Sequence, residues 1–595
     1  MIPAAMRFAD RNARILCAGG RGGAIAAVYT RALDGPFVFD DLGAIAGNDT
    51  LASLWPLSRV LAQPPDLTTS GRPLVALSLA LNRAVSGLDP RGYRATNAAL
   101  LWLAALFVFG VVRRTLRSPR LAPRFAAHAD ALAWMAAALF ALHPLASEVV
   151  CYVSARTESL VAVFYLATLY LAIRAREAER SGPWIGAAAL ACALGMACKE
   201  VMVSAPLVVA LHGAVFWGRE RQRVQLATFG CLALDWIVLA ALAFSAPRGE
   251  SAGFGHWVTP AIYLANQCRV LPHYLRLVVA PGPLVLDYGT PEPLGLSDVW
   301  PGALLLVALA ALSLVALRRW PAAGFVGVAC FAILAPSSSV FPIASEVGAE
   351  RRMLLPLAAL LAAGVAGTWA LLQRARRERL ARWIGGVVAL GLAALSFARA
   401  GDYRSEIALW QHDVAAAPAN RRAHYNLAKA YERAGRAEDA RAEMAQAVLG
   451  EIELYERVLP LQPDGVAARV DLGALHELAG EPARAEALYR EALERAPNDR
   501  YALRRLALFL VRNRADDPGQ VALAREYAER AVAATARRDA AALEALAEVE
   551  LAAGDREGAI ASLREAAATD PAGQPERVLE RVRARLAALE SPPRP

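Results

Sequence analysis

The chain lacks the short motifs that bind nucleotides. Its 595 residues contain no GxGxxG turn and no Walker-type phosphate loop, so the sequence does not indicate a nucleotide-binding domain. Paired cysteines are absent too: the seven cysteines lie in or beside apolar runs and form no CxxC pair, which argues against disulfide and metal roles. They are Cys17, Cys151, Cys192, Cys198, Cys231, Cys268 and Cys330.

Long apolar runs are absent after Gly401 but dominate the sequence between Ala95 and Ala398. There, runs of about 15–21 apolar residues alternate with short charged loops, and a bilayer core takes roughly 20 helical residues. We therefore predict an all-α protein with a polytopic membrane domain (1–400) followed by a soluble helical domain (401–595). The expected spans are 95–112, 130–146, 159–173, 183–198, 201–217, 226–246, 299–317, 321–336, 353–372 and 383–398.

The net charge of +9 does not indicate nucleic acid, because the arginines cluster in alternate loops between the apolar runs. The positive-inside rule places such loops in the cytoplasm. With an irregular first span near 14–30, about eleven spans put the N-terminus inside and the C-terminus outside. The stretches Leu74–Val85 and Ile262–Val279 mix charged and apolar residues, which is typical of interfacial helices. The arginine clusters lie at 113–124, 174–180, 219–223, 318–319 and 374–382.

Two adjacent carboxylates, Asp40 and Asp41, lie in the first outer loop of this topology. Carboxylates at a membrane boundary are costly unless they face water and have a task. Other polar residues of both charge signs fall on the same side, and this convergence predicts a site. They are His143, Glu148, Arg156, Glu158, Lys199, Glu200, His256, Asp287, Glu346, Glu350, Arg351 and Arg352.

The last third of the sequence is built from helical repeats. The stretch 425–447 pairs small residues with a glycine at the turn, as in a tetratricopeptide (TPR) unit, and the pattern recurs at 470–492 and 545–567. Pro463 and Pro497 lie 34 residues apart, the length of one such unit. Stacked helix pairs present a concave groove, so we expect either polypeptide docking or a structural role on the outer side.

Together these blocks resemble a known family. The membrane half resembles the GT-C glycosyltransferases that use lipid-linked sugars, and the whole chain is similar to their transmembrane-and-TPR O-mannosyltransferase-like subgroup. This resemblance implies transfer of a sugar from a polyprenyl-phosphate donor to an acceptor across the membrane, with Asp41 favoured as the base. The matching blocks are Phe37–Asp41 with Asn48, Arg72-Pro73-Leu74 with Asn82, Gly92-Tyr93 with Asn97, His143-Pro144 with Glu148, Arg156-Thr157-Glu158, Lys199-Glu200 and Glu350-Arg351.

The residue types suit this chemistry independently. A departing lipid phosphate needs cationic donors, for which Arg351 and Arg352 are the first candidates. Lys199 and Arg156 follow. The acceptor hydroxyl needs an ionised base, and one Asp of the pair fits while its neighbour orients it or raises its pKa. A single in-line displacement would invert the anomeric carbon. The other candidate substrate-binding residues are Glu158, His143, Glu148 and Glu350.

Each motif also has a structural interpretation. The Asp pair can cap the following helix, and His143-Pro144 can end one. Arg156 with Glu158, and Lys199 with Glu200, can be ion pairs. Two adjacent carboxylates can also bind Mg or Mn, although the displacement itself requires no cofactor.

Three functions fit the sequence. The first is a monosaccharide transferase acting on protein Ser or Thr, with a polyprenyl-phosphate sugar, membrane lipid and an acceptor polypeptide docked by the TPR groove as partners. The second is a ligase or transferase acting on lipid or polysaccharide, and the third a membrane-anchored TPR scaffold without activity. We expect a bacterial-type inner membrane location, with the site and the repeats facing the periplasm or exterior.

Overall fold

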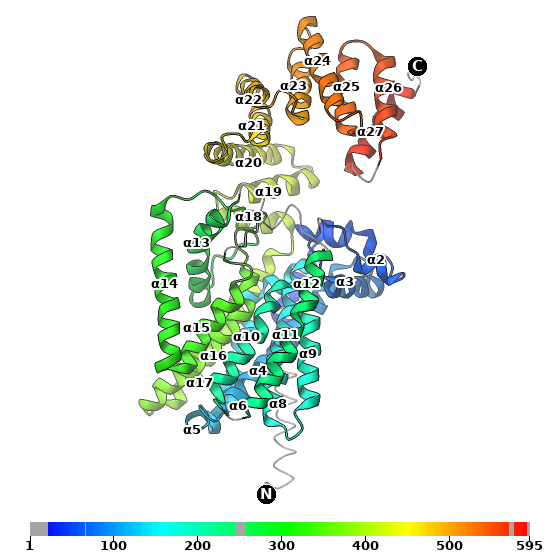
Figure 1. Ribbon diagram of the computed structural model, residues 1–595. Coiled ribbons are helices and arrows are strands. Elements are labelled where there is room, and N and C mark those ends of the chain that lie inside the picture. The colour runs from blue at the N-terminus through cyan, green and yellow to red at the C-terminus, as the bar shows by residue number, and fades with distance from the viewer. Residues whose placement is uncertain are drawn as a thin grey trace. The chain divides into compact units, whose positions relative to one another are not determined.

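The computed structural model describes residues 22–65, 67–219, 221–245, 258–339, 341–570 and 576–591. Within these ranges the chain consists of helices and connecting loops without a β-strand, which confirms the predicted all-α class. The chain divides into two compact units, Met1–Ala440 and Arg441–Pro595. In the first unit, long helices pack side by side as a bundle (Figure 1).

Every apolar run predicted as a span from residue 95 onward forms a helix. Short loops or single-turn helices separate most of these helices, whereas the 20-residue helix α13 (Pro260–Val279) lies between α12 and α14. They are α4 (Pro90–Leu116), α6 (Ala129–Leu142), α8 (Arg156–Glu177), α9 (Gly182–Met196), α10 (Ala205–Phe216), α11 (Gln222–Leu234) with α12 (Trp236–Ser245), α14 (Leu296–Arg319), α15 (Pro321–Leu334), α16 (Leu354–Arg374) and α17 (Glu378–Asp402).

Seven helical segments of the described chain are long and apolar enough to cross a membrane. The helices α9 and α15, and the segment Glu200–Phe216 that contains α10, are apolar but shorter. The total of about eleven spans stays a prediction. The predicted first span, near 14–30, lies partly outside the described residues. The described part belongs to a helix over residues 22–33.

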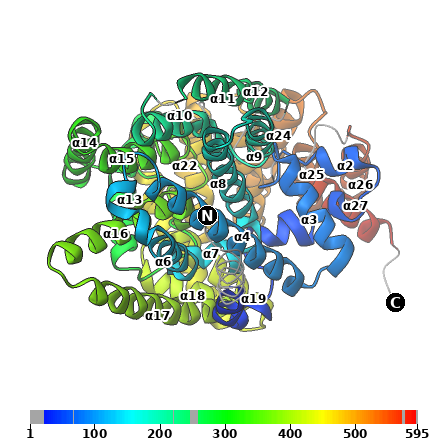
Figure 2. The same ribbon diagram turned by 90° about the horizontal axis from the view of Figure 1, so that it is seen from below.

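Helices of the bundle differ in how much of their surface is covered. In its most apolar window α8 is 78% buried and lies in the interior, whereas α14 is 6% buried and lies at the edge (Figure 2). On α14, Leu304, Val307 and Leu312 are each more than 60% exposed. Apolar surface this extensive is stable in hydrocarbon rather than in water, so the edge of the bundle fits a bilayer.

The two stretches predicted to be interfacial are helical and contribute to the end of the bundle that carries the site. The helix α3 (Pro73–Ser86) lies across the direction of the bundle helices in both views (Figures 1 and 2). The helix α13 (Pro260–Val279) packs against α14. Gly302 permits this contact, because a Cβ there would lie 1.7 Å from the carbonyl oxygen of Cys268.

The repeat sequence begins within the first unit and fills the second. The helices α18 (Glu406–Ala416) and α19 (Arg421–Arg433) belong to the first unit, and α20 (Ala437–Val458) begins there. The second unit contains antiparallel helix pairs, with α27 (Glu576–Glu590) packed on the last pair. The pairs are α21 (Val466–Leu478) with α22 (Pro482–Arg495), α23 (Arg500–Asn513) with α24 (Pro518–Ala534), and α25 (Ala540–Ala552) with α26 (Arg556–Ala567).

Glycines and alanines set the geometry of these pairs. Gly480 and Gly554 end the first helices of two pairs at φ values of +78° and +82°, a left-handed conformation that favours glycine. Within α21, Gly473 faces Tyr489 so closely that a Cβ would lie 2.7 Å from the ring. Tyr489 and its neighbour Ala485 are fully buried. The spacing of small residues therefore decides where the helices cross.

We expect Gly473→Val to loosen the pair α21–α22, because the added side chain collides with Tyr489. The cost of such overpacking is about 1–3 kcal/mol. Hydrogen exchange of the detergent-solubilised full chain should show faster exchange in residues 466–495. Ala483→Val, at an exposed position of α22, is the matched control and should leave exchange almost unchanged. Unchanged protection in Gly473→Val would contradict the predicted packing.

Candidate active site

The segment Phe37–Asp41 forms a tight turn after the first described helix. Val38 is fully buried, and Phe39 adopts a φ of +54°, a left-handed conformation that is unusual for a residue other than glycine. The Phe39 ring lies 6.3 Å from the ring of Tyr152 and 5.6 Å from that of Trp410, measured between centroids. Backbone strain of this kind concentrates at functional sites and persists only where the surroundings hold it.

The Asp41 carboxylate is fully buried and accepts hydrogen bonds at both oxygens. Its Oδ1 accepts from the backbone N–H and the hydroxyl of Ser154, at 2.7 and 2.6 Å. Its Oδ2 accepts from the backbone N–H groups of Val153 and Val38, at 3.3 and 3.4 Å. Burial raises the pKa of Asp41 to about 6, although the bonds from Ser154 oppose this shift. Asp41 thus fastens the turn at 153–155 to its own loop.

The Asp40 carboxylate has a different environment. Its Oδ2 accepts a hydrogen bond from the Tyr152 hydroxyl at 2.7 Å, and among the described residues no donor contacts Oδ1. Burial raises the pKa of Asp40, while the Tyr152 hydrogen bond and the positive charge of Arg351 oppose the rise. Glu346 raises it further and Arg422 lowers it. Asp40 therefore has an oxygen available to a ligand, and Asp41 does not.

A buried arginine that was not among the predicted site residues supports the turn. Arg94 on α4 is fully buried, and its Nε donates to the carbonyl oxygen of Cys151 at 2.8 Å. Its two terminal nitrogens donate to the carbonyl oxygens of Gly35 and Pro36. It joins the first loop to the segment that carries Tyr152. The sequence signal was weak: Arg94 follows directly after the Gly92-Tyr93 block.

Arg351 lies at the centre of a buried charge cluster. Its Nη1 donates to Glu148 at 2.5 Å and its Nη2 to Glu346 at 2.6 Å, while its Nε lies 3.9 Å from Glu158. Its guanidinium also lies 5.7 Å from the centroid of the Tyr152 ring. One guanidinium thus connects three carboxylates with the tyrosine that contacts Asp40.

Two further cations complete the cluster. Lys199 pairs with Glu158, and the Nη2 of Arg352 lies 2.9 Å from Glu346. Although burial alone would raise it, Arg351 and Arg352 together lower the pKa of Glu346 to about 2. A buried carboxylate that two cations keep ionised is part of a preorganised polar site.

The remaining predicted residues lie near the cluster with most of their polar atoms occupied. The Nδ1 of His143 accepts from the backbone N–H of Leu145, and its Nε2 lies 3.1 Å from the Val278 carbonyl oxygen. This pattern fits a neutral ring protonated at Nε2. Glu350 accepts from the backbone N–H of Val285 at 2.8 Å and from the Tyr288 hydroxyl at 2.7 Å.

Arg156 and Lys199 are not paired as the local sequence pattern indicated. Arg156 is fully buried and donates to Asn97 at 2.7 Å and to the Tyr93 carbonyl at 2.8 Å, so it joins α8 to α4. Lys199 pairs with Glu158, while Glu200 lies 3.6 Å from Arg72. Among the described residues, no group of three or more His, Cys, Asp or Glu side chains is arranged to hold a metal.

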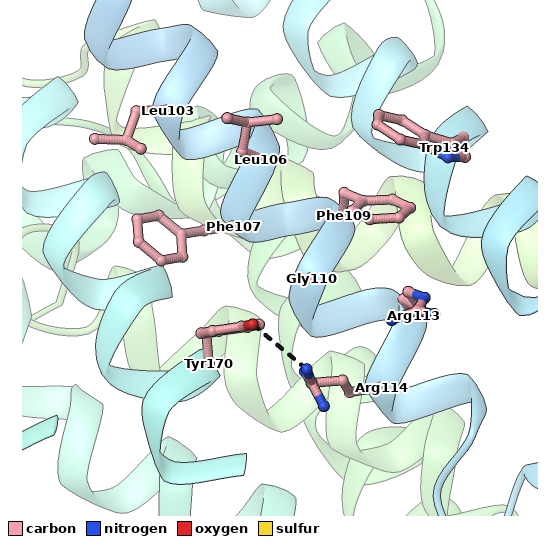
Figure 3. A pocket seen from close by; sticks show the side chains of 9 residues that line it. All are labelled: Leu103, Leu106, Phe107, Phe109, Gly110, Arg113, Arg114, Trp134 and Tyr170. Carbon is pink, nitrogen blue, oxygen red and sulfur yellow. Dashed lines mark hydrogen bonds between the residues drawn. The ribbon is translucent and has the colours of Figure 1, made fainter. Parts of the chain in front are cut away.

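A cavity of 330 Å³ between α4, α6 and α8 contains none of these residues (Figure 3). Phe109 stacks on Trp134 there with ring centroids 4.0 Å apart. Arg114 lies beside Tyr170, whose hydroxyl it contacts at 3.4 Å, and pairs with Glu177. The lining of this cavity shares no residue with the site around Asp40, so the cavity is distinct from that site.

The fold and the site together define a polytopic helical membrane protein with a buried, charge-lined carboxylate site and a TPR segment. A family model described as tetratricopeptide repeat matches residues 466–509. Similar proteins include protein O-mannosyl-transferase Tmtc2 of Drosophila melanogaster, 30% identical over 304 residues, which cover 46% of this chain and 30% of that protein. The resemblance identified from the sequence blocks is thereby confirmed.

Two further relatives align over more of the chain. Protein O-mannosyl-transferase F38B6.6 of Caenorhabditis elegans is 23% identical over 69% of this chain and 59% of its own length. Protein O-mannosyl-transferase TMTC4 of Mus musculus is 26% identical over 67% of this chain and 62% of its own length. The chain thus spans less than two thirds of each. The crystal structure of yeast Tom70, 12% identical with a TM-score of 0.21, covers 80% of this chain and 95% of its own; a score this low establishes no common fold.

We expect Ser154→Ala to destabilise the protein, because Asp41 loses its hydroxyl donor. A hydrogen bond to a charged group contributes about 1.5–3 kcal/mol. Ser159→Ala is the matched control: its hydroxyl is also buried but donates to the neutral Val149 carbonyl, so its loss should cost about 1 kcal/mol. Thermal unfolding of both variants in detergent provides the comparison. Equal losses would contradict the role given to Asp41.

Proposed function

We propose that this chain is a membrane glycosyltransferase that moves a hexose from a polyprenyl-phosphate donor to a Ser or Thr hydroxyl of a protein. The names of its relatives specify mannose as the hexose. The observation that carries the proposal is the Asp40 carboxylate, which has one oxygen available beside Tyr152 and the Arg351 cluster. The similarity to proteins named protein O-mannosyl-transferases supports it.

In this proposal Asp40 is the base and Asp41 its support. As the acceptor oxygen attacks the anomeric carbon, its proton passes to Asp40 and the bond between that carbon and the donor phosphate breaks. One displacement inverts the anomeric centre. Asp41 is the poorer base because four protein donors already occupy its oxygens. This assignment differs from the preference for Asp41 that the family resemblance suggested.

The cationic side chains would stabilise the departing phosphate. Arg351 and Lys199 are bound to carboxylates in this structure, so a donor phosphate would compete with Glu148 and Glu158 for them. Guanidinium groups bind phosphate oxygens in a bidentate manner, and preorganised charges act strongly in a site shielded from water. Arg352 keeps Glu346 ionised and so holds Arg351 in place.

The second unit offers a surface for the acceptor. A cavity of 1340 Å³ is lined in part by Arg500, Arg504 and Arg537, and Arg504 also borders a neighbouring cavity of 330 Å³. Arginines outnumber carboxylates around both, so the surface suits a polypeptide with acidic residues. We propose that this TPR surface docks the acceptor, and that the site and the repeats face the periplasm or exterior of a bacterial-type inner membrane.

We expect Asp40→Asn to lower transfer by about 10²–10⁴-fold, because the amide cannot take the proton. In the wild-type protein the rate should fall as the pH drops through the pKa of Asp40, which lies above its usual range. Transfer from polyprenyl-phosphate mannose to a Ser/Thr peptide, followed by mass spectrometry on the purified full chain, measures this. Asp34→Asn, at an exposed acid of the same segment, is the control and should retain activity.

Full activity in Asp40→Asn would overturn the assignment of the base. Glycan on lipid or polysaccharide with unmodified protein would instead indicate the second candidate function. An inactive wild-type protein on every acceptor class would favour the scaffold.

We expect transfer to persist after exhaustive treatment with EDTA, because the proposed displacement uses protein charges in place of a metal. Both oxygens of Asp41 are engaged by N–H and O–H donors, which leaves a single carboxylate of the pair for coordination. Activity in the assay above, before and after chelation, tests this. A loss that Mg²⁺ or Mn²⁺ restores would instead place a cation at Asp40.

A further inference from the structure

The first repeat helix pair is built into the unit that carries the site. The buried side chain of Asp413 on α18 accepts from the backbone N–H groups of Leu286 and Asp287, at 2.8 and 3.3 Å. The Nδ2 of Asn420, at the start of α19, donates to the Asp287 carbonyl at 2.6 Å. On the same helix pair Trp410 is fully buried and contacts Phe39. This pair therefore holds both the 282–292 loop and the loop that carries Asp40.

Arg422 on α19 lies beside Phe39, the residue that directly precedes the acidic pair. Its Nε and Nη2 donate to the two carboxylate oxygens of Asp287, the first at 2.6 Å. Its Nη1 donates to the Ser345 carbonyl at 2.5 Å, one residue before Glu346. Its guanidinium lies 5.6 Å from the centroid of the Phe39 ring, and Phe39 directly precedes Asp40. A bidentate pair with a fully buried carboxylate fixes the guanidinium in place.

We propose that Arg422 is a positioning residue of the active site, through which the first repeat pair orients the Phe39-Asp40 segment and supplies positive charge to the base. This inference rests on the proposed function. It makes the start of the repeat region part of the catalytic apparatus, whereas the later repeats dock polypeptide.

The charge of Arg422 acts on Asp40 together with a small set of other groups. Arg422 lowers the pKa of both Asp40 and Glu346. A merely structural anchor would act through its hydrogen bonds alone, so loss of Arg422 and loss of its partner Asp287 would have the same effect. If the charge of Arg422 acts on Asp40, the two losses should have different effects. Among the described residues, the charged or titratable groups that act on Asp40 are Tyr152, Glu346, Arg351 and Arg422, and Asp41 follows it in the chain.

The test compares Arg422→Gln with Asp287→Asn in the full-length enzyme. Both variants break the same bidentate pair, but the first removes a positive charge near Asp40 and the second removes the negative charge that partly neutralises it. We expect the acid limb of the pH–rate profile to move to higher pH in Arg422→Gln, by roughly 0.5–1 pH unit, and to stay or move lower in Asp287→Asn. Arg422→Lys keeps the charge without the fork, so its acid limb should stay near that of the wild type.

The matched control is Arg433→Gln, which removes an arginine of the same helix that pairs with Glu406. Its profile should superimpose on that of the wild type. Acid limbs that move together in Arg422→Gln and Asp287→Asn, or that do not move in either, would overturn the role of Arg422. If Arg422→Gln fails to fold, Arg422→Lys replaces it in the test. An acid limb of Arg422→Lys displaced to higher pH would then overturn the role of Arg422. A wild-type protein without transferase activity would refute the proposed function itself, which is a separate outcome.

Discussion

The hydrogen bonds between Asp41 and the turn at 153–155 are the constraint on which the rest of the site depends. A carboxylate with no exposed surface is stable only if its oxygens find donors, and Asp41 finds them in two segments more than 100 residues apart. Because those donors include backbone N–H groups, side-chain substitution in the turn cannot remove them all. The turn then carries Tyr152 to Asp40 and brings the first loop against the start of α8.

Adjacent residues of the same type thus have different roles because of their surroundings. Asp41 faces inward and is satisfied by protein, whereas Asp40 retains an oxygen that no described donor occupies. The left-handed conformation of Phe39 turns the chain between the buried Val38 and the acidic pair. Burial raises the pKa of both carboxyl groups, and hydrogen bonds and nearby cations limit that rise.

The cluster around Arg351 also depends on buried charges that find partners in distant segments of the chain. Its cations and carboxylates come from different helices and loops, and each is partly or fully shielded from water. Removing a single member leaves an unpaired buried charge, which is far more costly than the loss of an exposed ion pair. Such a cluster holds its shape through its own ion pairs.

Much of the architecture could be predicted from the sequence, because hydrophobic length and repeat spacing are local properties. The apolar runs became helices, the TPR units formed around the glycines and alanines that marked them, and the Asp pair and the polar blocks near Arg351 came together at one end of the bundle. Partners within the site could not be predicted. The sequence offered Arg156 beside Glu158 and Lys199 beside Glu200, yet Lys199 pairs with Glu158, and Arg156 binds Asn97. Tyr152 and Arg422 carried no local signal, and Arg94 carried only a weak one, its position directly after the Gly92-Tyr93 block. Adjacency along a helix decides which face a side chain occupies, but only the packing of distant helices decides which charge it meets. The sequence alone therefore determined the class of fold and the chemical types available, and the tertiary structure decided which carboxylate of the pair keeps an oxygen that no described donor occupies.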